Sequence, residues 1–328
     1  MTFMFTANSR RIMASMAVSI AVFMSWVGTV RGETSVQTVK GEPAPAREDA
    51  PSVYELKKAT YTGIYTTPVT LSKGVYEGPP FVPGAATRPR VELIDSQPLS
   101  GDLSEDGSRQ AVVFLKEDSG GSATDIYMAI VVRKEGAVVN LATVRIGDRI
   151  IVRSGRIEKG RIVLEVLQHG AKDAACCPSE LATRIWSLER DGLVEQVVRK
   201  RTGSLNLATL IGAEWVLGGS TMDPASSQLP EITLVFEKDR VRGSAGCNRY
   251  LGYARGTKVP GEITVKASKS LNQECAETVM LREGTYLDAL RHSTRFGFYF
   301  GDLIIHWQDE EGRSGILRFA PRSKPSNK

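Results

Sequence analysis

Four cysteines and three histidines are the residues of this 328-residue chain that enzymes and metal sites use most readily. They are Cys176, Cys177, Cys247 and Cys275, with His169, His292 and His306. No Cys-x-x-Cys spacing occurs, and the histidines do not cluster with the cysteines in sequence, so a metal site is not indicated. In an exported chain, four cysteines allow three disulfide connectivities. We favour Cys247–Cys275, with the adjacent Cys176 and Cys177 either reduced or bridged to each other in a small, strained ring.

A catalytic serine or cysteine needs a neighbouring base to become nucleophilic. The candidate nucleophiles are Ser119 and Ser122 in a glycine-rich loop or the Cys176-Cys177 pair. His169 would be the base, and an Asp would complete the set. The loop sequence Gly-Gly-Ser-Ala lacks the Gly-x-Ser-x-Gly spacing of a nucleophile elbow. We therefore predict no catalytic residues and no enzyme activity, and we keep a hydrolase as the alternative.

Alternating oxygen-bearing side chains at Asp102, Ser104 and Asp106, followed by a glycine, resemble the first half of a calcium loop. However, Ser104 replaces the usual carboxylate, and Val113 stands where a calcium loop has its twelfth-position Glu. The favoured interpretation is a polar turn with no metal and no cofactor. A calcium-stabilised adhesion or inhibitor module is the alternative.

The N-terminal segment carries most of the excess positive charge. The net charge is +5, and residues 1–32 hold three of the 42 Lys and Arg residues and no acid, so their removal leaves 39 basic against 37 acidic residues, or +2. Arg10 and Arg11 precede an apolar run from Ile12 to Val30, and a tolerable cleavage pattern follows, which predicts a signal peptide. The alternative is an uncleaved membrane anchor, because the run nearly spans a bilayer. We expect a periplasmic or secreted protein that contacts a membrane only through an uncleaved leader, and no nucleic-acid binding.

The rest of the chain predicts β-rich domains. Residues 33–52 are rich in Pro, Ala, Glu and Thr and predict a disordered tether. From 53 to 200, short β-rich segments recur with glycine turns between them, which predicts an antiparallel meander, sandwich or barrel. One such strand is expected at 61–65. The segments 110–116 and 125–133 are almost continuously apolar, so we expect both of their faces to be buried.

A second β-rich domain is expected at residues 211–320, followed by a basic tail at 321–328. Within it, apolar residues change to a spacing of three or four between Ala276 and Leu290, with Glu283 and Leu287 in the same series. This spacing predicts one amphipathic helix of roughly four turns. The predicted fold class is therefore mostly β with one main helix.

The densest turn-forming sequence is Gly243–Tyr253, which holds three glycines and an asparagine. These residue types allow backbone conformations that other side chains resist. We interpret the segment Gly246, Cys247, Asn248, Arg249 and Tyr250 as a structural motif in which Asn248 takes a left-handed or turn conformation. The alternative is a ligand-binding corner formed by Asn248 and Arg249.

This part of the chain resembles the META domain, the family of the heat-inducible HslJ-like envelope proteins. The matching segments are Trp215–Leu217, Ile232–Phe236, Val241–Tyr250 with Gly252, Cys275, Glu283 and Leu287, Gly301–Leu303, and Leu317–Phe319. The resemblance covers residues 211–320 and departs from the family pattern at Ser268–Glu274. It implies a curved sheet or barrel with one packed helix, no catalytic residues, and an envelope protein associated with stress tolerance. The preceding domain resembles the region often found before META domains in exported bacterial proteins. The segments that carry this resemblance are Ser119–Ser122 and Cys176–Pro178.

The sequence therefore predicts an exported, non-catalytic module of the cell envelope. Its partner is expected to be an envelope protein, a lipid or a wall component, bound at exposed strand edges or long loops. If the helix start packs beside the Gly-Cys-Asn corner, a Cys247–Cys275 bond would enclose 27 residues and stabilise the fold by roughly 3 kcal/mol.

Overall fold

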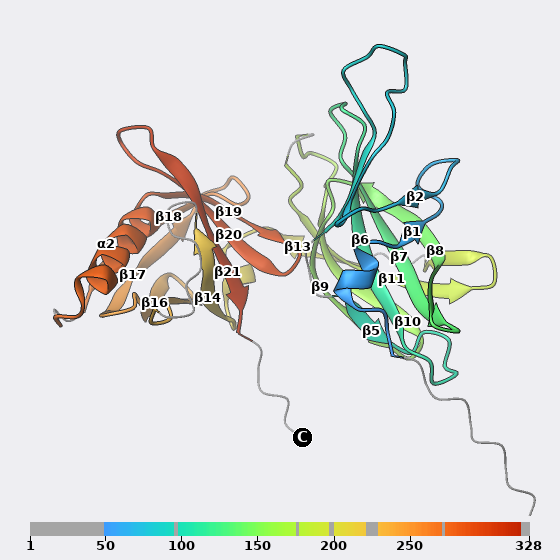
Figure 1. Cartoon of the computed structure of the whole chain (residues 1–328). Helices are drawn as coiled ribbons and strands as arrows, with labels where there is room; N and C mark the ends of the chain where they lie inside the picture. Colours follow the sequence, from blue (N-terminus) through green and yellow to red (C-terminus); the bar gives the residue numbers. More distant parts are fainter. Residues whose placement is uncertain are drawn as a thin grey trace, which may run out of the picture. The chain divides into compact units, whose positions relative to one another are not determined.

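A computed structural model describes residues 49–94, 98–174, 177–196, 200–220, 229–270 and 273–322. The predicted signal peptide, nearly all of the predicted tether and nearly all of the predicted basic tail lie outside the described residues. The described chain is mostly β with one main helix, as the sequence predicts (Figure 1). None of the helices in the described ranges has the length and hydropathy of a membrane span.

In the described residues, the N-terminal region contains two larger antiparallel sheets besides one pair of short strands. The first has the order β3 (Val75–Glu77), β4 (Arg90–Leu93), β6 (Gln110–Asp118), β7 (Asp125–Lys134), β8 (Ala137–Asp148), with β5 (Leu99–Gly101) also paired to β6. The second has the order β12 (Gly192–Glu195), β11 (Glu180–Glu189), β10 (Arg161–Gln168), β9 (Ile151–Glu158), with β13 (Lys200–Ser204) also paired to β11. The division into separate domains at 53–200 and 211–320 stays a prediction.

The strands β6 and β7 are buried on both faces, as their apolar runs predict. Phe114 and Met128 belong to a core that also contains Trp186 of the second sheet. On the opposite face, Val113 and Ala129 pack with side chains of α1 (Val53–Leu56) and of the strand pair β1 (Thr60–Tyr61) and β2 (Val69–Thr70). Because neither face meets water, apolar residues occupy nearly every position of these strands.

The prediction of a strand at 61–65 is wrong. Extended structure ends at Tyr61, and the residues after it form a bend. Gly63 has a φ of 81°, a left-handed conformation that turns the chain out of a strand and that glycine adopts without a steric penalty.

The C-terminal region is built on one eight-stranded antiparallel sheet. Its order is β18 (Ile263–Lys269), β17 (Arg249–Gly256), β16 (Arg240–Ser244), β15 (Thr233–Glu237), β14 (Glu214–Ser220), β21 (Ser314–Pro321), β20 (Asp302–Gln308), β19 (Ser293–Tyr299). The two ends of this sheet meet where Glu262, just before β18, forms an isolated bridge with Arg295 of β19. The sheet is therefore a nearly closed barrel.

Two glycines of the segment Gly243–Tyr253 allow neighbouring strands to approach each other closely. A Cβ atom on Gly243 would lie 1.9 Å from the carbonyl oxygen of Thr233. A Cβ atom on Gly252 would lie 2.1 Å from the carbonyl oxygen of Lys266. No side chain fits at either position, so glycine is needed where the sheet curves.

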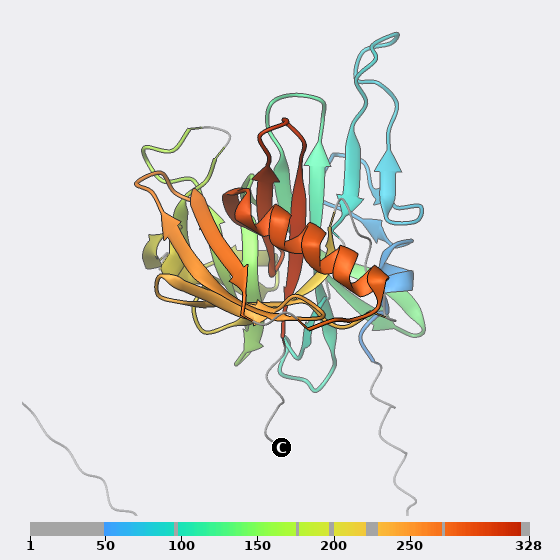
Figure 2. The same ribbon diagram turned by 90° about the vertical axis from the view of Figure 1, so that its left-hand side faces the viewer.

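The predicted helix is α2 (Glu277–Arg291), which packs against β18, β20 and β21 and crosses the sheet (Figure 2). Its buried residues begin at Glu283 and include Tyr286 and Leu287. The earlier apolar positions of the predicted series do not mark a buried face, because Met280 is 41% and the adjacent Leu281 is 72% exposed. The first two turns of α2 are therefore held mainly by contacts other than apolar packing.

Candidate functional site

The motif predicted from the sequence forms the corner between β16 and β17. The backbone N–H of Ala245 donates to the carbonyl oxygen of Asn248 at 2.8 Å, which closes the bend. The left-handed conformation that we considered for Asn248 occurs instead at Gly246, with a φ of 102°, and Asn248 itself lies in the same bend. The only residue type without a Cβ thus stands where the backbone needs a positive φ.

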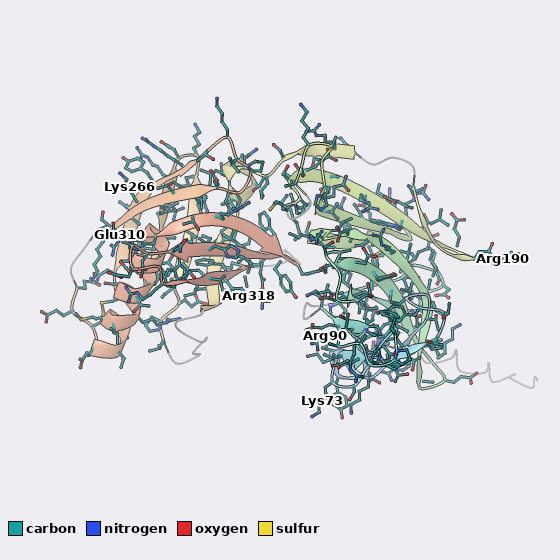
Figure 3. All side chains as sticks on the ribbon, turned by 90° about the horizontal axis from the view of Figure 1, so that it is seen from above. Lys73, Arg90, Arg190, Lys266, Glu310 and Arg318 are labelled. Carbon is teal, nitrogen blue, oxygen red and sulfur yellow. A yellow bond between two sulfur atoms is a disulfide. The ribbon has the colours of Figure 1, made fainter. Side chains whose placement is uncertain are left out.

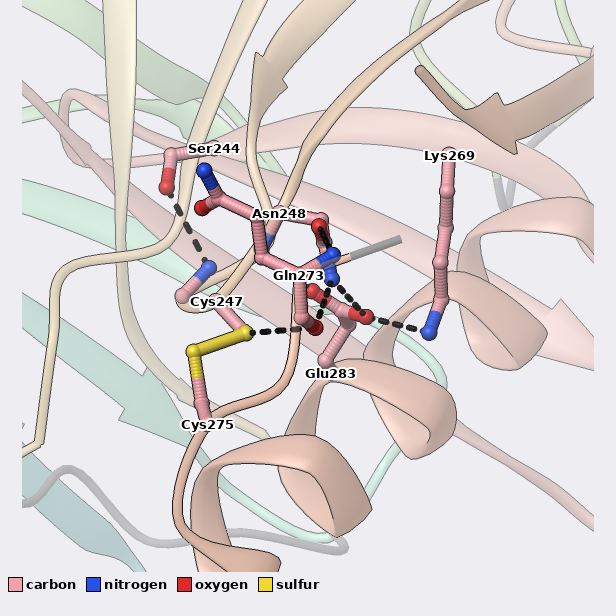
Figure 4. Close-up of a disulfide and its surroundings, with 8 residues drawn as sticks. Ser244, Cys247, Asn248, Lys269, Gln273, Cys275 and Glu283 are labelled. Carbon is pink, nitrogen blue, oxygen red and sulfur yellow. Dashed lines mark hydrogen bonds and ion pairs between the residues drawn. A yellow bond between two sulfur atoms is a disulfide. The ribbon is translucent and has the colours of Figure 1, made fainter. Parts of the chain in front are cut away.

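A disulfide ties this corner to the start of α2. Cys247 in the bend and Cys275, two residues before the helix, are bonded, and their Cα atoms are 6.0 Å apart (Figure 4). This is the pairing that we favoured from the sequence. Cys177 is also disulfide-bonded, whereas Cys176 lies outside the described residues.

The side chain of Asn248 is buried beside the disulfide and joins three segments of the chain. Its backbone N–H donates to Glu283 Oε2 at 2.6 Å, and its Nδ2 donates to Glu283 Oε1 at 3.1 Å. Its Oδ1 accepts from the backbone N–H of Gln273 at 2.8 Å. Lys269, at the end of β18, forms an ion pair with Glu283 (Figure 4). Helix, bend and strand are therefore joined through one fully buried carboxylate.

The environment of Glu283 keeps its carboxylate charged. Burial alone raises the pKa of a carboxyl group, but hydrogen bonds from Lys269 and Asn248 outweigh it and lower the pKa of Glu283 below its ordinary value of 4.5. A general acid would instead need a raised pKa and a path to substrate. Glu283 is suited to hold the fold and not to transfer protons.

A pair of tyrosines fixes the inner side of the same corner. The Tyr250 hydroxyl donates to the carbonyl oxygen of Thr233 at 2.8 Å, and it lies 2.7 Å from the hydroxyl of Tyr286 on α2. Burial, together with the neighbouring Tyr286, raises the pKa of Tyr250, and burial likewise raises that of Tyr286. Both phenols are therefore neutral hydrogen-bonding groups at physiological pH.

Comparison with known families identifies this part of the chain. The family model of the META domain matches residues 208–318. Residues 208–318 form a META domain. A solved structure described as "NMR structure of the protein from Burkholderia xenovorans" is 23% identical to the chain, covers 37% of it and 90% of its own chain, and gives a TM-score of 0.29. A comparison with curated proteins found no match.

The META domain also presents a polar surface that the sequence analysis missed. We call it the outer face, defined by six exposed side chains that alternate with core residues along β16, β17 and β18: Arg240, Arg242, Arg249, Leu251, Tyr253 and Lys266. The strand register places Tyr253 directly between Arg240 and Lys266, and Leu251 directly opposite Arg242. An apolar stripe on β17 is therefore flanked by cations from both neighbouring strands.

The outer face is hollowed and strongly basic. Five of its residues line a hollow of about 730 Å³, among them Lys266, which is labelled in Figure 3. Arg249 helps to line a neighbouring hollow of about 660 Å³. Arg242 is paired with Glu237 at 2.7 Å. Within the described parts of the chain, Arg240, Arg249 and Lys266 make no side-chain hydrogen bond or ion pair. Of the two residues considered for a ligand-binding corner, Asn248 is thus buried in the fold, whereas Arg249 projects from the outer face.

The residues considered for calcium form the turn between β5 and β6. Asp102 Oδ2 accepts from the backbone N–H of Gly107 at 2.7 Å, and Asp106 Oδ1 accepts from the backbone N–H of Ser108 at 2.8 Å. Ser104 lies in the same turn, where its hydroxyl accepts from a glutamine amide. In the described ranges, no group of three or more His, Cys, Asp or Glu residues is placed to hold a metal ion.

The residues considered for hydrolysis lie on separate loops. Ser119 and Ser122 lie between β6 and β7, where the Ser119 hydroxyl donates to Glu117. His169 lies after β10, and no hydrogen bond joins it to either serine within the described chain. Nearby, Asp173 accepts from the backbone N–H and the hydroxyl of Ser179 and so orders its own loop. The structure does not bring these groups together into a catalytic triad.

Two features were not predicted from the sequence: the burial and pairing of Glu283, and the outer face. Each of them nevertheless had a sequence signal. Glu283 occupies a position at apolar helical spacing, which is unusual for a carboxylate and indicates a buried, paired one. The outer face is visible as alternation: the buried Val241 separates Arg240 from Arg242, and Gly252 separates Leu251 from Tyr253. What the sequence does not contain is the register that places these strands side by side.

Proposed function

We propose that this chain is an exported, non-catalytic module of the cell envelope that binds a partner through the outer face of its META domain. The observation that carries the proposal is that the polar groups of the corner are paired within the fold, whereas two cations of the outer face are not. Asn248, Glu283 and Lys269 pair with one another around the corner. By contrast, Arg240 and Lys266 project into a hollow with no partner in the described chain.

The disulfide between Cys247 and Cys275 supports an extracytoplasmic location, since structural disulfides persist in oxidising compartments. The leader-like sequence of residues 1–32 supports the same location. The separation of His169 from Ser119 and Ser122 supports a role in binding over one in hydrolysis. The association with envelope stress tolerance follows from the META family and is part of the proposal.

The test uses cells that produce the chain, wild type or with the substitutions Arg240→Ala and Lys266→Ala. We expect mass spectrometry to find the mature N-terminus after residue 32, and washed envelopes to retain the wild type but not the variant. The matched control is Lys172→Ala with Arg190→Ala, which removes the same charge from exposed positions outside the outer face.

A chain that stays in the cytoplasm with reduced cysteines would contradict the proposal. So would labelling of the protein by a serine- or cysteine-directed activity probe, or equal envelope retention of all three proteins. Cells lacking the chain should also lose tolerance to heat, and unchanged tolerance would remove the stress association.

A further inference from the structure

The outer face holds more positive charge than the described residues of the chain neutralise. Arg240 and Lys266 are two strands apart, so their backbones are separated by about 10 Å. Neither side chain has a hydrogen-bonding or ion-pair partner within the described parts of the chain. Like charges held at one surface repel, and an anionic ligand that lies between them removes this repulsion. Arginine, in addition, recognises carboxylate and phosphate groups through paired hydrogen bonds.

The centre of the outer face is apolar. A small inorganic anion would gain nothing from contact with these apolar side chains. Tyr253 is 54% and Leu251 is 58% exposed, and they are neighbours along the same face of β17. The hydroxyl groups of Thr264 and Ser268 line the same hollow. A ligand that fits this surface has flat apolar faces for the ring of Tyr253, hydroxyl groups for Thr264 and Ser268, and anionic groups for the cations on either side.

Three other classes of partner fit the surface less well. A bilayer is flat, whereas this surface is hollowed. Single-stranded nucleic acid stacks successive bases on several aromatic rings, but Tyr253 is the one aromatic side chain among the six residues of the outer face. A peptide that adds to a sheet needs an unpaired strand edge, but β17 is paired on both sides, with β16 and with β18.

We infer that the outer face of the META domain is a binding site for an acidic glycan, a chain of sugar rings that carry carboxylate or phosphate groups. The glycan lies along β17, with a ring stacked on Tyr253 and anionic groups bound by Arg240, Arg242 and Lys266. Arg249 extends the site toward the corner at the start of β17. This inference rests on the proposed function, for which it names the chemical class of the partner.

Isothermal titration calorimetry on the purified protein tests the inference. The glycan probes are a short oligogalacturonate, which carries carboxylates, and a phosphomannan fragment, which carries phosphates. The comparison ligands are the neutral methyl ester of the oligogalacturonate, polyglutamate, single-stranded DNA and phosphatidylglycerol vesicles. The variants are Arg240→Ala with Lys266→Ala, Tyr253→Ala, and the charge-matched control Lys172→Ala with Arg190→Ala. Thermal unfolding of each variant verifies that it is folded.

We expect at least one glycan probe to bind, with the affinity falling as salt is raised from about 50 to about 300 mM. The double outer-face variant should bind it about tenfold more weakly, and Tyr253→Ala about fivefold more weakly. The control should stay within about twofold of the wild type. For the carboxylated probe, the neutral ester should bind at least about tenfold more weakly than its acidic parent.

Three outcomes would overturn the inference. The first is that neither glycan binds, and the second is that polyglutamate, DNA or the vesicles bind as tightly as the glycans. The third is that the outer-face variants bind like the wild type. If neither glycan binds but the double variant is still lost from washed envelopes, the ligand class is wrong and the proposed function stands. If both effects are absent, both proposals fail.

Discussion

The carboxylate of Glu283 holds Asn248, which lies 35 residues earlier in the chain, through hydrogen bonds to both its backbone N–H and its side-chain amide. The same carboxylate is paired with Lys269, so one buried group joins α2, the bend before β17 and the end of β18. Removing it would leave the backbone N–H of Asn248 buried without an acceptor, and the side-chain amide with only the carbonyl oxygen of Gln273. The corner of the META domain should therefore be sensitive to substitutions that leave its shape unchanged.

Substitution of Glu283 by Gln should destabilise the fold by about 3 kcal/mol near neutral pH. Glutamine keeps the size of the side chain but loses the charge and turns one acceptor into a donor that faces Asn248. Urea unfolding, followed by circular dichroism, measures the effect. Glu310→Gln is the control, because Glu310 is an exposed carboxylate, and it should change stability by less than about 0.5 kcal/mol.

The stability contributed by Glu283 should depend on pH in one direction. Its pKa in the folded state is lowered from 4.5, so its contribution is fully present above that value and is lost as pH falls through the folded pKa. The difference in unfolding free energy between wild type and Glu283→Gln should therefore shrink below about pH 4.5. A difference that stays constant down to acid unfolding would show that the charge is not what matters.

Replacing Cys247 and Cys275 together by serine should lower the unfolding free energy by about 3–4 kcal/mol, given the sequence separation of 28 residues. Reductant should then shift the urea midpoint of this variant less than that of the wild type, because only the bond at Cys177 remains. A loss below about 1 kcal/mol would mean that the corner is held by its hydrogen bonds alone.

The two tyrosines of the corner should show energetic coupling. Tyr250→Phe leaves the carbonyl oxygen of Thr233 buried without a donor, at a cost of about 1–3 kcal/mol. Tyr286→Phe removes the contact between the two hydroxyl groups. In a double-mutant cycle, the combined loss should be smaller than the sum of the single losses by at least about 0.5 kcal/mol. Strict additivity would contradict the hydrogen-bonded pair.

Two glycines should respond to alanine in opposite ways. Gly284 lies inside α2, and a Cβ there would meet no atom within 4 Å, so Gly284→Ala should stabilise the fold by up to about 1 kcal/mol. Gly252→Ala should destabilise it, because the Cβ would lie 2.1 Å from the carbonyl oxygen of Lys266. Melting temperatures that move in the same direction for both variants would contradict this account of where the strands approach closely.

The sequence predicts those parts of the molecule that depend on local pattern. Alternation and apolar runs predict the β-rich class and the two buried faces of β6 and β7, and a change of period predicts α2. The strand expected after Tyr61 fails because Gly63 takes a positive φ, which outweighs the β-forming residues around it. A similar limit applies at the corner, where glycine, and not Asn248, supplies the left-handed turn.

The candidate site could be predicted only in part, because its pieces meet through tertiary packing. Cys247, Asn248 and Tyr250 stand out through their residue types and neighbours. Their partners on β18 and α2 are far away in sequence, and only the folded, nearly closed barrel brings Lys269 and Glu283 to the bend. The outer face is hidden for the same reason, since three strands must be in register before their alternating cations form one surface.

The most direct test of the account measures stability and ligand binding on the same two variants. We predict that Glu283→Gln, studied well below its unfolding temperature, loses stability and retains affinity for the glycan probe that binds the wild type. Arg240→Ala with Lys266→Ala should retain the wild-type melting temperature within about 3 °C and lose about tenfold in affinity. The opposite pattern, in which the outer-face variant binds normally and folded Glu283→Gln does not bind, would place function at the buried corner and contradict the account.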